Sequence, residues 1–309
     1  MSNTKDNFLV VIAGPTASGK TKLSLQLAQF FQTVIINADS RQFYKELQIG
    51  TAPPTNEDLQ KVKHYFVQNL SIHDYYNVSK YENDVLLLLN ELFETYKIIF
   101  LVGGSGLYID AVCKGIDDMP EYDPELRANL IEMLNEKGIE WLRALLKQLD
   151  PDTYNRIDLK NKNRVLRAIE VSLQTGLPYS SFLKRTPKKR PFNIIKIAIN
   201  KEREKLYADI NSRVDEMIKA GLVNEALSLY KYKHLTPLKT VGYKELFDFI
   251  ENKITLDEAI DLIKRNTRKY ARKQLTWFRR DKEYKWFDSN DLEKITQYIF
   301  EKVNEKNFL

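Results

Sequence analysis

Residues 8–21 read Phe8-Leu-Val-Val-Ile-Ala13-Gly14-Pro-Thr-Ala-Ser-Gly19-Lys20-Thr21. The apolar run 8–13 predicts a buried strand, and the apolar spacing within 22–29 predicts a helix. Between them stands the complete P-loop pattern Gly-x-x-x-x-Gly-Lys-Thr, in the strand-to-helix context that such a loop requires. Its backbone N–H groups face an anion, its lysine adds a charge, and its threonine hydroxyl is placed for Mg²⁺. We predict a polyphosphate-binding loop, with Thr21 as a Mg²⁺ ligand, made of Gly14, Pro15, Thr16, Ala17, Ser18, Gly19, Lys20 and Thr21.

Other apolar runs predict further buried strands at 33–37, 97–102 and 193–199. Helical patterns alternate with them, at 83–96, 201–220 (ended by Gly221), 255–280 (begun by Thr255 with Glu258 in a capping box) and 291–305. Buried strands that alternate with helices are typical of a parallel sheet covered on both faces. We therefore predict an α/β fold with a P-loop, nucleotide-kinase-like core, in which 284–288 forms an edge strand.

The pattern changes near residue 117, after which only helical periodicity is visible as far as 175. Pro124 is typical of a helix start, and Gly138 and Asp150-Pro151 are typical of breaks. We predict a core of residues 1–116 and 191–309, interrupted by a helical insertion domain at 117–190.

Composition excludes several classes of protein. The 43% hydrophobic content over 309 residues excludes a wholly disordered chain, and the net charge of +6 fits a polyanionic partner. The single cysteine, Cys113, cannot form an intramolecular disulfide, which predicts a cytoplasmic location. No apolar stretch reaches the ~20 residues of a membrane span, and the three scattered histidines exclude a Cys/His zinc site.

The motifs resemble one family, the tRNA dimethylallyltransferases (tRNA isopentenyltransferases). The matching segments, in chain order, are 14–21, Asp39-Ser-Arg-Gln-Phe-Tyr44, Ile49-Gly-Thr-Ala52, Gly103-Gly-Ser-Gly-Leu-Tyr108, 163–170 with Thr175-Gly176, Val241-Gly-Tyr-Lys-Glu245 and 272–279. The resemblance implies transfer of a dimethylallyl group from dimethylallyl diphosphate to the exocyclic N6 amine of the adenosine 3′ to the anticodon (position 37). The products would be N6-dimethylallyladenosine and diphosphate. The P-loop, a common ATP-binding motif, would then hold an isoprenoid diphosphate with Mg²⁺.

Asp39 is the expected general base. It follows a predicted core strand, at the sheet edge where open α/β folds bind ligands, and a carboxylate there can accept the proton that the amine loses. The alternative is a turn or helix-capping aspartate. The resemblance adds Thr16 and Arg213 as catalytic residues, with Arg203 as a weaker candidate for holding the diphosphate.

The resemblance also implies contacts with the anticodon stem-loop of tRNA, which the insertion would clamp. The expected tRNA-binding residues are Asp39, Ser40, Arg41, Gln42, Ser105, Arg127, Asn163, Arg164, Val165, Leu166 and Arg167. Two basic stretches, 184–190 and 264–280, fit a phosphate track, although solvated faces are the alternative. We expect RNA and isoprenoid to enter one channel from separate sides.

Three other activities remain open from the sequence. They are a P-loop small-molecule kinase, an adenylate isopentenyltransferase that acts on the free nucleotide, and an RNA-binding NTPase without transferase activity. A P-loop is compatible with each of them, because it specifies only a polyphosphate. We expect a monomer, since we identify no long apolar stripe for an interface.

Overall fold

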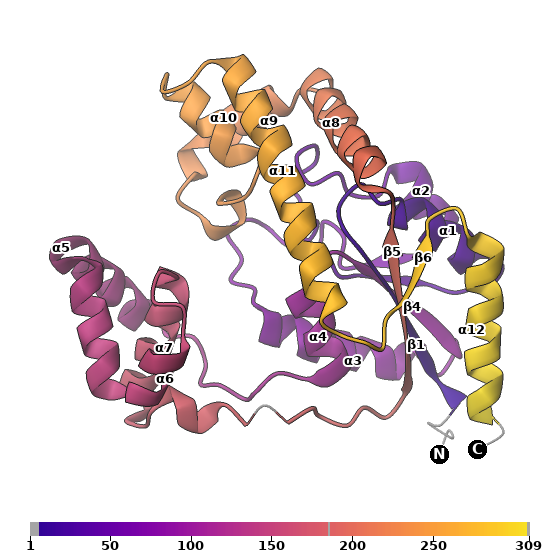
Figure 1. Ribbon diagram of the computed structural model, residues 1–309, viewed down its shortest axis with the longest axis horizontal. Helices are drawn as coiled ribbons and strands as arrows, with labels where there is room; N and C mark the ends of the chain where they lie inside the picture. The colour runs from indigo at the N-terminus through magenta and orange to yellow at the C-terminus, as the bar shows by residue number, and fades with distance from the viewer. Residues whose placement is uncertain (1–5, 185, 308–309) are drawn as a thin grey trace. The chain divides into compact units, whose positions relative to one another are not determined.

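The computed structural model describes residues 6–184 and 186–307 (Figure 1). It contains two compact units, one formed by Met1–Lys114 with Lys189–Leu309 and the other by Gly115–Lys188. The sequence placed these boundaries at 116/117 and 190/191. Arg185, within the basic stretch 184–190, lies outside the described residues.

The larger unit is built on a six-stranded sheet with the order β3-β2-β4-β1-β5-β6. Its strands are β1 (Phe8–Ala13), β2 (Ile35–Asn37), β3 (His64–Tyr65), β4 (Ile98–Gly103), β5 (Asn193–Asn200) and β6 (Lys285–Asp288). Every neighbouring pair is parallel, and Val11 at the centre lies opposite Leu101 and Lys196. The predicted parallel α/β core is confirmed, with β6 at the edge. The short strand β3 was not predicted, because two residues carry too little periodicity.

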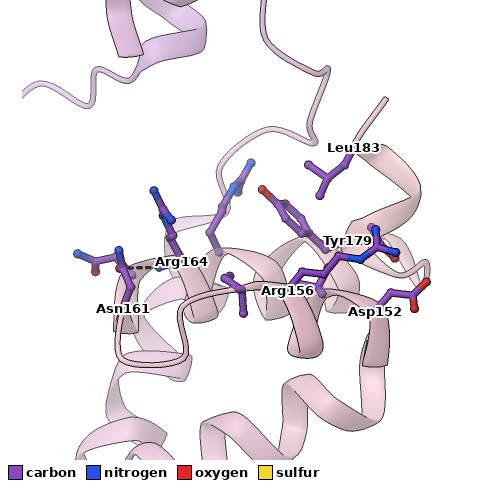
Figure 2. Close-up of a pocket in the computed structure, with 11 residues that line it drawn as sticks. Asp152, Arg156, Asn161, Arg164, Tyr179 and Leu183 are labelled. Carbon is purple, nitrogen blue, oxygen red and sulfur yellow. Dashed lines mark hydrogen bonds between the residues drawn. The ribbon is translucent and has the colours of Figure 1, made fainter. Parts of the chain in front are cut away.

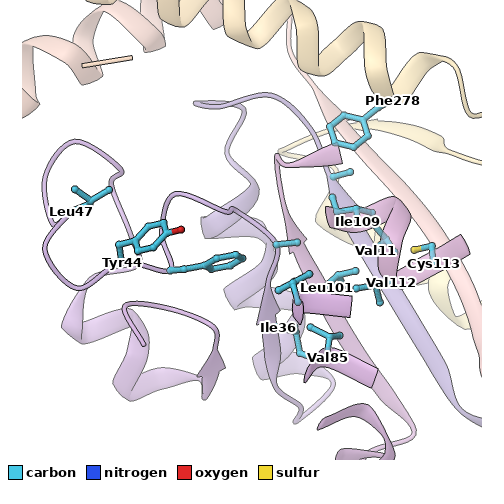
Figure 3. Packing of buried hydrophobic residues seen from close by; sticks show 14 of the residues in the cluster. Val11, Ile36, Tyr44, Leu47, Val85, Leu101, Ile109, Val112, Cys113 and Phe278 are labelled. Atoms are coloured by element: carbon cyan, nitrogen blue, oxygen red, sulfur yellow. The ribbon is translucent and has the colours of Figure 1, made fainter. Parts of the chain in front are cut away.

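Alternation along β1 explains why both faces of the sheet are covered. Leu9, Val11 and Ala13 belong to one buried cluster, while the intervening Phe8 and Val10 belong to another, with Ile12. Figure 3 shows part of the first cluster, where side chains of adjacent strands meet those of helices α4 and α11. The helices of this unit are α1 (Lys20–Phe30), α2 (Asn56–Lys61), α3 (Val78–Leu92), α4 (Gly106–Lys114), α8 (Arg203–Lys219), α9 (Leu222–Leu229), α10 (Tyr243–Ile250), α11 (Leu256–Arg279) and α12 (Leu292–Asn307).

Helix boundaries follow local capping chemistry. Thr255 caps α11 and forms the predicted capping box with Glu258. Gly221, with φ 100°, follows the end of α8 and separates it from α9. The helix predicted at 83–96 instead spans Val78–Leu92, because the Asn77 side chain accepts a hydrogen bond from the Lys80 N–H and starts the helix earlier. Within the described residues, no helix is both long and apolar enough to cross a membrane.

The smaller unit is helical throughout its ordered elements: α5 (Pro124–Leu149), α6 (Pro151–Arg156), α7 (Lys162–Thr175) and a short 3₁₀ helix, Tyr179–Phe182. Gly138 breaks α5 with φ 78° and ψ 178°, as its position predicted. Asp150 separates α5 from α6, and its carboxylate accepts hydrogen bonds from Thr153 N–H (2.9 Å) and Ser180 N–H (2.6 Å). This unit has its own apolar core, centred on Leu142, Leu146 and Ile169.

Candidate active site

The P-loop is held tightly between β1 and α1. Gly14 has φ 154°, and a Cβ atom there would lie 2.5 Å from the carbonyl oxygen of Ile199 on β5. Only glycine therefore fits this approach of two strands. Gly19, with φ 92°, precedes α1 and turns the chain into the helix. The N-terminus of α1 then faces the loop, which provides the N–H groups and partial positive charge that an anion requires.

Lys20 lies at the base of this loop, where its Nζ donates a hydrogen bond to the carbonyl oxygen of Pro15 (2.6 Å). Desolvation lowers its pKa to about 8; the Asp39 carboxylate opposes this shift and the Arg213 guanidinium adds to it. A desolvated ammonium gains much from an incoming anion, because the anion replaces the lost hydration.

Arg213 reaches the same place from α8. Its Nη1 donates to Thr16 Oγ1 (3.4 Å) and its Nη2 to the carbonyl oxygen of Ala52 (3.3 Å). Desolvation also lowers the pKa of this guanidinium. The three residues predicted to be catalytic, Thr16, Asp39 and Arg213, thus line the same place in the structure. Arg203, the weaker candidate, is exposed at the start of α8, with its guanidinium 5.3 Å from the ring centre of Tyr207.

Asp39 lies two residues beyond the end of β2. Its N–H donates to Asn37 Oδ1 (3.1 Å), and its own Oδ1 accepts from the Arg41 N–H (3.1 Å). The turn role considered from the sequence is therefore real, but it coexists with a position on the walls of two cavities. The hydrogen bonds of the turn fix the orientation of the Asp39 carboxylate at the cavity walls.

Two cavities meet around these residues. The polar cavity, of about 350 Å³, has residues 16–21 of the P-loop, Lys201 and Asp209 in its lining. The apolar cavity, of about 210 Å³, is lined mainly by Ile210, Val214, Met217, Leu222, Val241, Ile263 and Tyr270. Residues common to both linings are Thr16, Ala17, Asp39, Thr51 and Arg213. The arrangement can hold a diphosphate beside an apolar group, with a carboxylate where the two parts of a ligand would join.

Ser40 and Arg41 line the apolar cavity, and Gln42 lines the polar one. Ser40 N–H donates to Ser105 Oγ (3.0 Å), and their hydroxyls are 3.1 Å apart. The Gln42 amide Nε2 donates to the carbonyl oxygens of Thr51 (3.1 Å) and Ala52 (2.8 Å), so those contacts use its donor group.

Comparison with known proteins agrees with this geometry. The family model described as IPP transferase matches residues 42–281. The chain is 50% identical to tRNA dimethylallyltransferase 2 of Azobacteroides pseudotrichonymphae over 302 residues, which cover 97% of this chain and 98% of the relative. It is also 50% identical to the tRNA dimethylallyltransferase of Christiangramia forsetii, over 96% of this chain and 99% of that one. The chain belongs to the IPP transferase family.

The fold agrees as well. The crystal structure of the full-length tRNA isopentenylpyrophosphate transferase from Bacillus halodurans superposes on this IPP transferase with a TM-score of 0.72. The two chains are 35% identical, and the superposition covers 97% of this chain and 98% of the other. These relatives are tRNA-modifying enzymes rather than kinases.

Two residues at the site of this IPP transferase were not predicted. Gln274 of α11 is buried, its Oε1 accepts from the Thr16 N–H (2.9 Å), and its Nε2 donates to the Gly104 carbonyl (2.9 Å). Lys201 lines the polar cavity, with Nζ 2.7 Å from Asp209 Oδ2. Gln274 lies within the family motif 272–279, but the motif did not indicate its partners.

The residues predicted in the insertion do not all have the same role. Arg164 and Asn163 are exposed and line a pocket of about 650 Å³ at the α6–α7 end of this unit (Figure 2). Val165 and Leu166 were expected to contact tRNA, but their side chains are buried in the core of the unit. Since they follow the helical period toward α5, their side chains stabilise the insertion instead.

The two remaining arginines of the insertion form ion pairs. Arg127 Nη1 lies 3.1 Å from Glu170 Oε2, and Arg167 binds the other oxygen of the same buried carboxylate. Arg167 also donates to the carbonyl oxygen of Pro120 (2.9 Å). The Arg127–Glu170 pair joins α5 to α7, and Arg167 links α7 to Pro120 before α5, so both arginines have structural partners in addition to any role with RNA.

The basic residues of α11 divide in a similar way. Lys264 pairs with Asp215 (2.6 Å) and Arg268 donates to Asn211 Oδ1 (2.6 Å), so these two bind α8. Four other basic side chains surround an open surface hollow together with Trp277: Lys269, Arg272, Lys273 and, at the end of the helix, Arg280. Arg280 stacks on Trp277, with 4.1 Å from the guanidinium carbon to the ring centre, whereas Phe278 is buried.

Proposed function

We propose that this IPP transferase moves a dimethylallyl group from dimethylallyl diphosphate to the N6 amine of adenosine 37 in tRNA, and releases diphosphate. The relatives at 50% identity support the reaction. The observation that carries it is the junction of the polar and apolar cavities at Thr16, Asp39 and Arg213. A diphosphate in the first cavity and an isoprenoid tail in the second would place the reacting carbon next to the Asp39 carboxylate.

The P-loop would stabilise the leaving group. As the C–O bond breaks, its electron pair passes to the diphosphate, where charge develops near Lys20, Arg213 and the loop N–H groups. Groups that are already in place for this charge stabilise the transition state more than the ground state. Lys201, which lines the same cavity, would add a third positive side chain.

Asp39 would act as the general base. The adenosine amine attacks the allylic carbon, a C–N bond forms, and the proton released from nitrogen passes to the carboxylate. The hydrogen bond from Arg41 N–H to Oδ1 fixes the orientation of the carboxylate, and leaves Oδ2 as the oxygen to receive the proton. Tyr270 lines the same cavity; desolvation raises the pKa of its hydroxyl to about 12, so it would remain a neutral hydrogen-bond donor there.

Mg²⁺ fits the polar cavity through oxygen ligands. Thr21, at the start of α1, is exposed and lines this cavity, and a hydroxyl is a ligand type that Mg²⁺ accepts. Among the described residues, no three acidic, histidine or cysteine side chains group into a metal site. The ion would therefore be held mainly by the diphosphate and water, with Thr21 as its protein ligand. When bound, it would neutralise charge on the departing diphosphate.

The tRNA side of the proposal rests on the residues that follow Asp39 and on the exposed basic residues. Ser40, Arg41 and Gln42 would contact the anticodon loop, together with Ser105. Asn163 and Arg164 of the insertion would contact the stem-loop, which the insertion would clamp. Arg127 and Arg167 would contribute to this contact while they remain bound to Glu170. The basic hollow on α11 would bind RNA phosphates. We propose that the enzyme acts as a cytoplasmic monomer.

The test is a nucleoside mass analysis. Unmodified tRNA with adenosine at position 37 is incubated with the protein, Mg²⁺ and dimethylallyl diphosphate, and we expect one dimethylallyl group on adenosine. A tRNA with guanosine at position 37 and the Asp39→Asn variant are the matched controls. Equal prenylation of free AMP would favour the adenylate isopentenyltransferase, and ATP consumption without prenylation would favour a kinase or NTPase.

A further inference from the structure

The segment Ile49-Gly-Thr-Ala52 is fixed by a carboxylate from a distant helix. Glu225 of α9 accepts hydrogen bonds from three consecutive backbone N–H groups. Its Oε2 receives those of Gln48 (3.0 Å) and Ile49 (2.8 Å), and its Oε1 receives that of Gly50 (3.0 Å). Such charge-assisted bonds to backbone N–H groups are among the stronger hydrogen bonds in proteins.

A fourth donor to this carboxylate comes from the segment Val241-Gly-Tyr-Lys-Glu245. The hydroxyl of the buried Tyr243 donates to Glu225 Oε1 (2.6 Å), and burial raises the pKa of this hydroxyl, which keeps it protonated. Gly50 makes room for it, since a Cβ at residue 50 would lie 2.6 Å from the Tyr243 hydroxyl oxygen. Two motifs that are far apart in the sequence are thus joined through Glu225.

The anchored segment accepts hydrogen bonds from two residues of the active site. The carbonyl oxygen of Ala52 accepts from Arg213 Nη2 (3.3 Å), and the Thr51 and Ala52 carbonyls accept from Gln42. Ala52 has φ 43°, an unfavourable backbone conformation for alanine that its surroundings must maintain. Gly50 and Thr51 also line the apolar cavity.

We infer that Glu225 and Tyr243 are positioning residues, which hold the 49–52 segment so that its carbonyls direct Arg213 toward the diphosphate and Gln42 toward the RNA. The inference rests on the proposed function. Neither residue touches a substrate in this scheme; both act through the backbone of residues 48–52.

The experiment compares Glu225→Gln and Tyr243→Phe with Glu251→Gln and Tyr230→Phe. The second pair is a matched control, because Tyr230 donates its hydroxyl to Glu251 Oε1 (2.9 Å) in the same unit, and neither residue lines the two cavities. We expect Glu225→Gln to lower kcat/KM for dimethylallyl diphosphate about 10- to 100-fold and Tyr243→Phe about 3- to 10-fold. The controls should stay within about twofold of the wild type.

Inorganic pyrophosphate binding, measured by calorimetry, gives a readout that does not depend on transfer. Its affinity should fall in Glu225→Gln, because Arg213 loses its orientation, and should be unchanged in Glu251→Gln. If Glu225→Gln does not fold, Tyr243→Phe carries the same test. Wild-type pyrophosphate affinity in both site variants would overturn the positioning role. A wild-type enzyme that transfers no dimethylallyl group would instead overturn the proposed function.

Discussion

In the polar cavity Lys20 and Arg213 are desolvated cations with lowered pKa values, whereas in the insertion Arg127 and Arg167 both bind one buried carboxylate, Glu170. The first pair shares the Asp39 carboxylate, and Glu216 adds a second opposing charge for Arg213, but desolvation is the largest cause of both shifts, so the pair gains from an incoming anion. In the second pair one buried carboxylate offsets one of the two positive charges, and its ion pair with Arg127 joins α5 to α7. The proposed ligand-binding role of the first pair and the structural role of the second therefore follow from the different surroundings of the cations.

The largest expected effect is on chemistry at the cavity junction. Asp39→Asn should lower the single-turnover rate on bound tRNA by about 10²–10⁴, because the proton loses its acceptor. tRNA affinity, measured by filter binding, should change by less than about threefold. Lost tRNA binding together with an unchanged single-turnover rate would contradict the general-base role.

The next effect tests the structural role of the insertion arginines. Glu170→Gln leaves two guanidinium groups without their buried carboxylate, so the free energy of unfolding should fall by about 3 kcal/mol. Denaturation of the full chain, followed by tryptophan fluorescence and circular dichroism, measures the change. Glu140→Gln is the control, because Glu140 forms an exposed ion pair with Arg143. Equal stability of both variants would mean that Arg127 and Arg167 are not held structurally.

The pH dependence of diphosphate binding should follow Lys20. Its pKa is lowered to about 8 in the free protein, and a bound diphosphate must raise it, so binding takes up a proton above pH 8. The contribution of Lys20 to pyrophosphate affinity should be constant below pH 8. Above pH 8 the affinity should fall by up to about tenfold per pH unit. Calorimetry in buffers of different ionisation enthalpy measures the proton uptake. Lys20→Met should abolish this dependence, and a Lys20→Met protein with the wild-type profile would exclude Lys20 as its source.

The same lowered pKa has a consequence for stability. The folded pKa of about 8 lies below the ordinary lysine value of 10.5, so the cost of burying the ammonium is fully present below pH 8. It is lost as pH rises toward 10.5, because the unfolded chain then binds more protons than the folded one. The wild type should therefore gain stability relative to Lys20→Met over this window, as thermal unfolding in a pH series would show.

The smallest effect separates exposed from paired arginines. Arg164→Gln should reduce the slope of log affinity for tRNA against log salt by about one unit or less, with unchanged stability. Arg156→Gln, in the same pocket, is the comparison. A stability loss in Arg164→Gln, with an unaltered slope, would assign Arg164 to the structural group as well.

Much of the fold could be predicted because its signals are local. The P-loop pattern, the strand runs, the Gly138 break and the Thr255 cap each depend on a few adjacent residues, and the structure has all four. The short strand β3 and the early start of α3 were missed, since two residues or a single asparagine cap carry little periodic signal. Val165 and Leu166 were assigned to RNA by motif alone, although their helical spacing directs them into a core.

The amino-acid sequence by itself determined the chemistry available to this protein: an anion-binding loop, a carboxylate after a core strand, and a family resemblance that extends along the chain. Tertiary structure decided the partners. It brought Gln274 to Thr16 across 258 residues of sequence and Arg213 to Thr16 across 197, and it placed Glu225 on the 48–50 backbone. The physical reason is that capping and periodicity act over a few residues. The partner of a buried charge, in contrast, is chosen by how whole helices pack on the sheet.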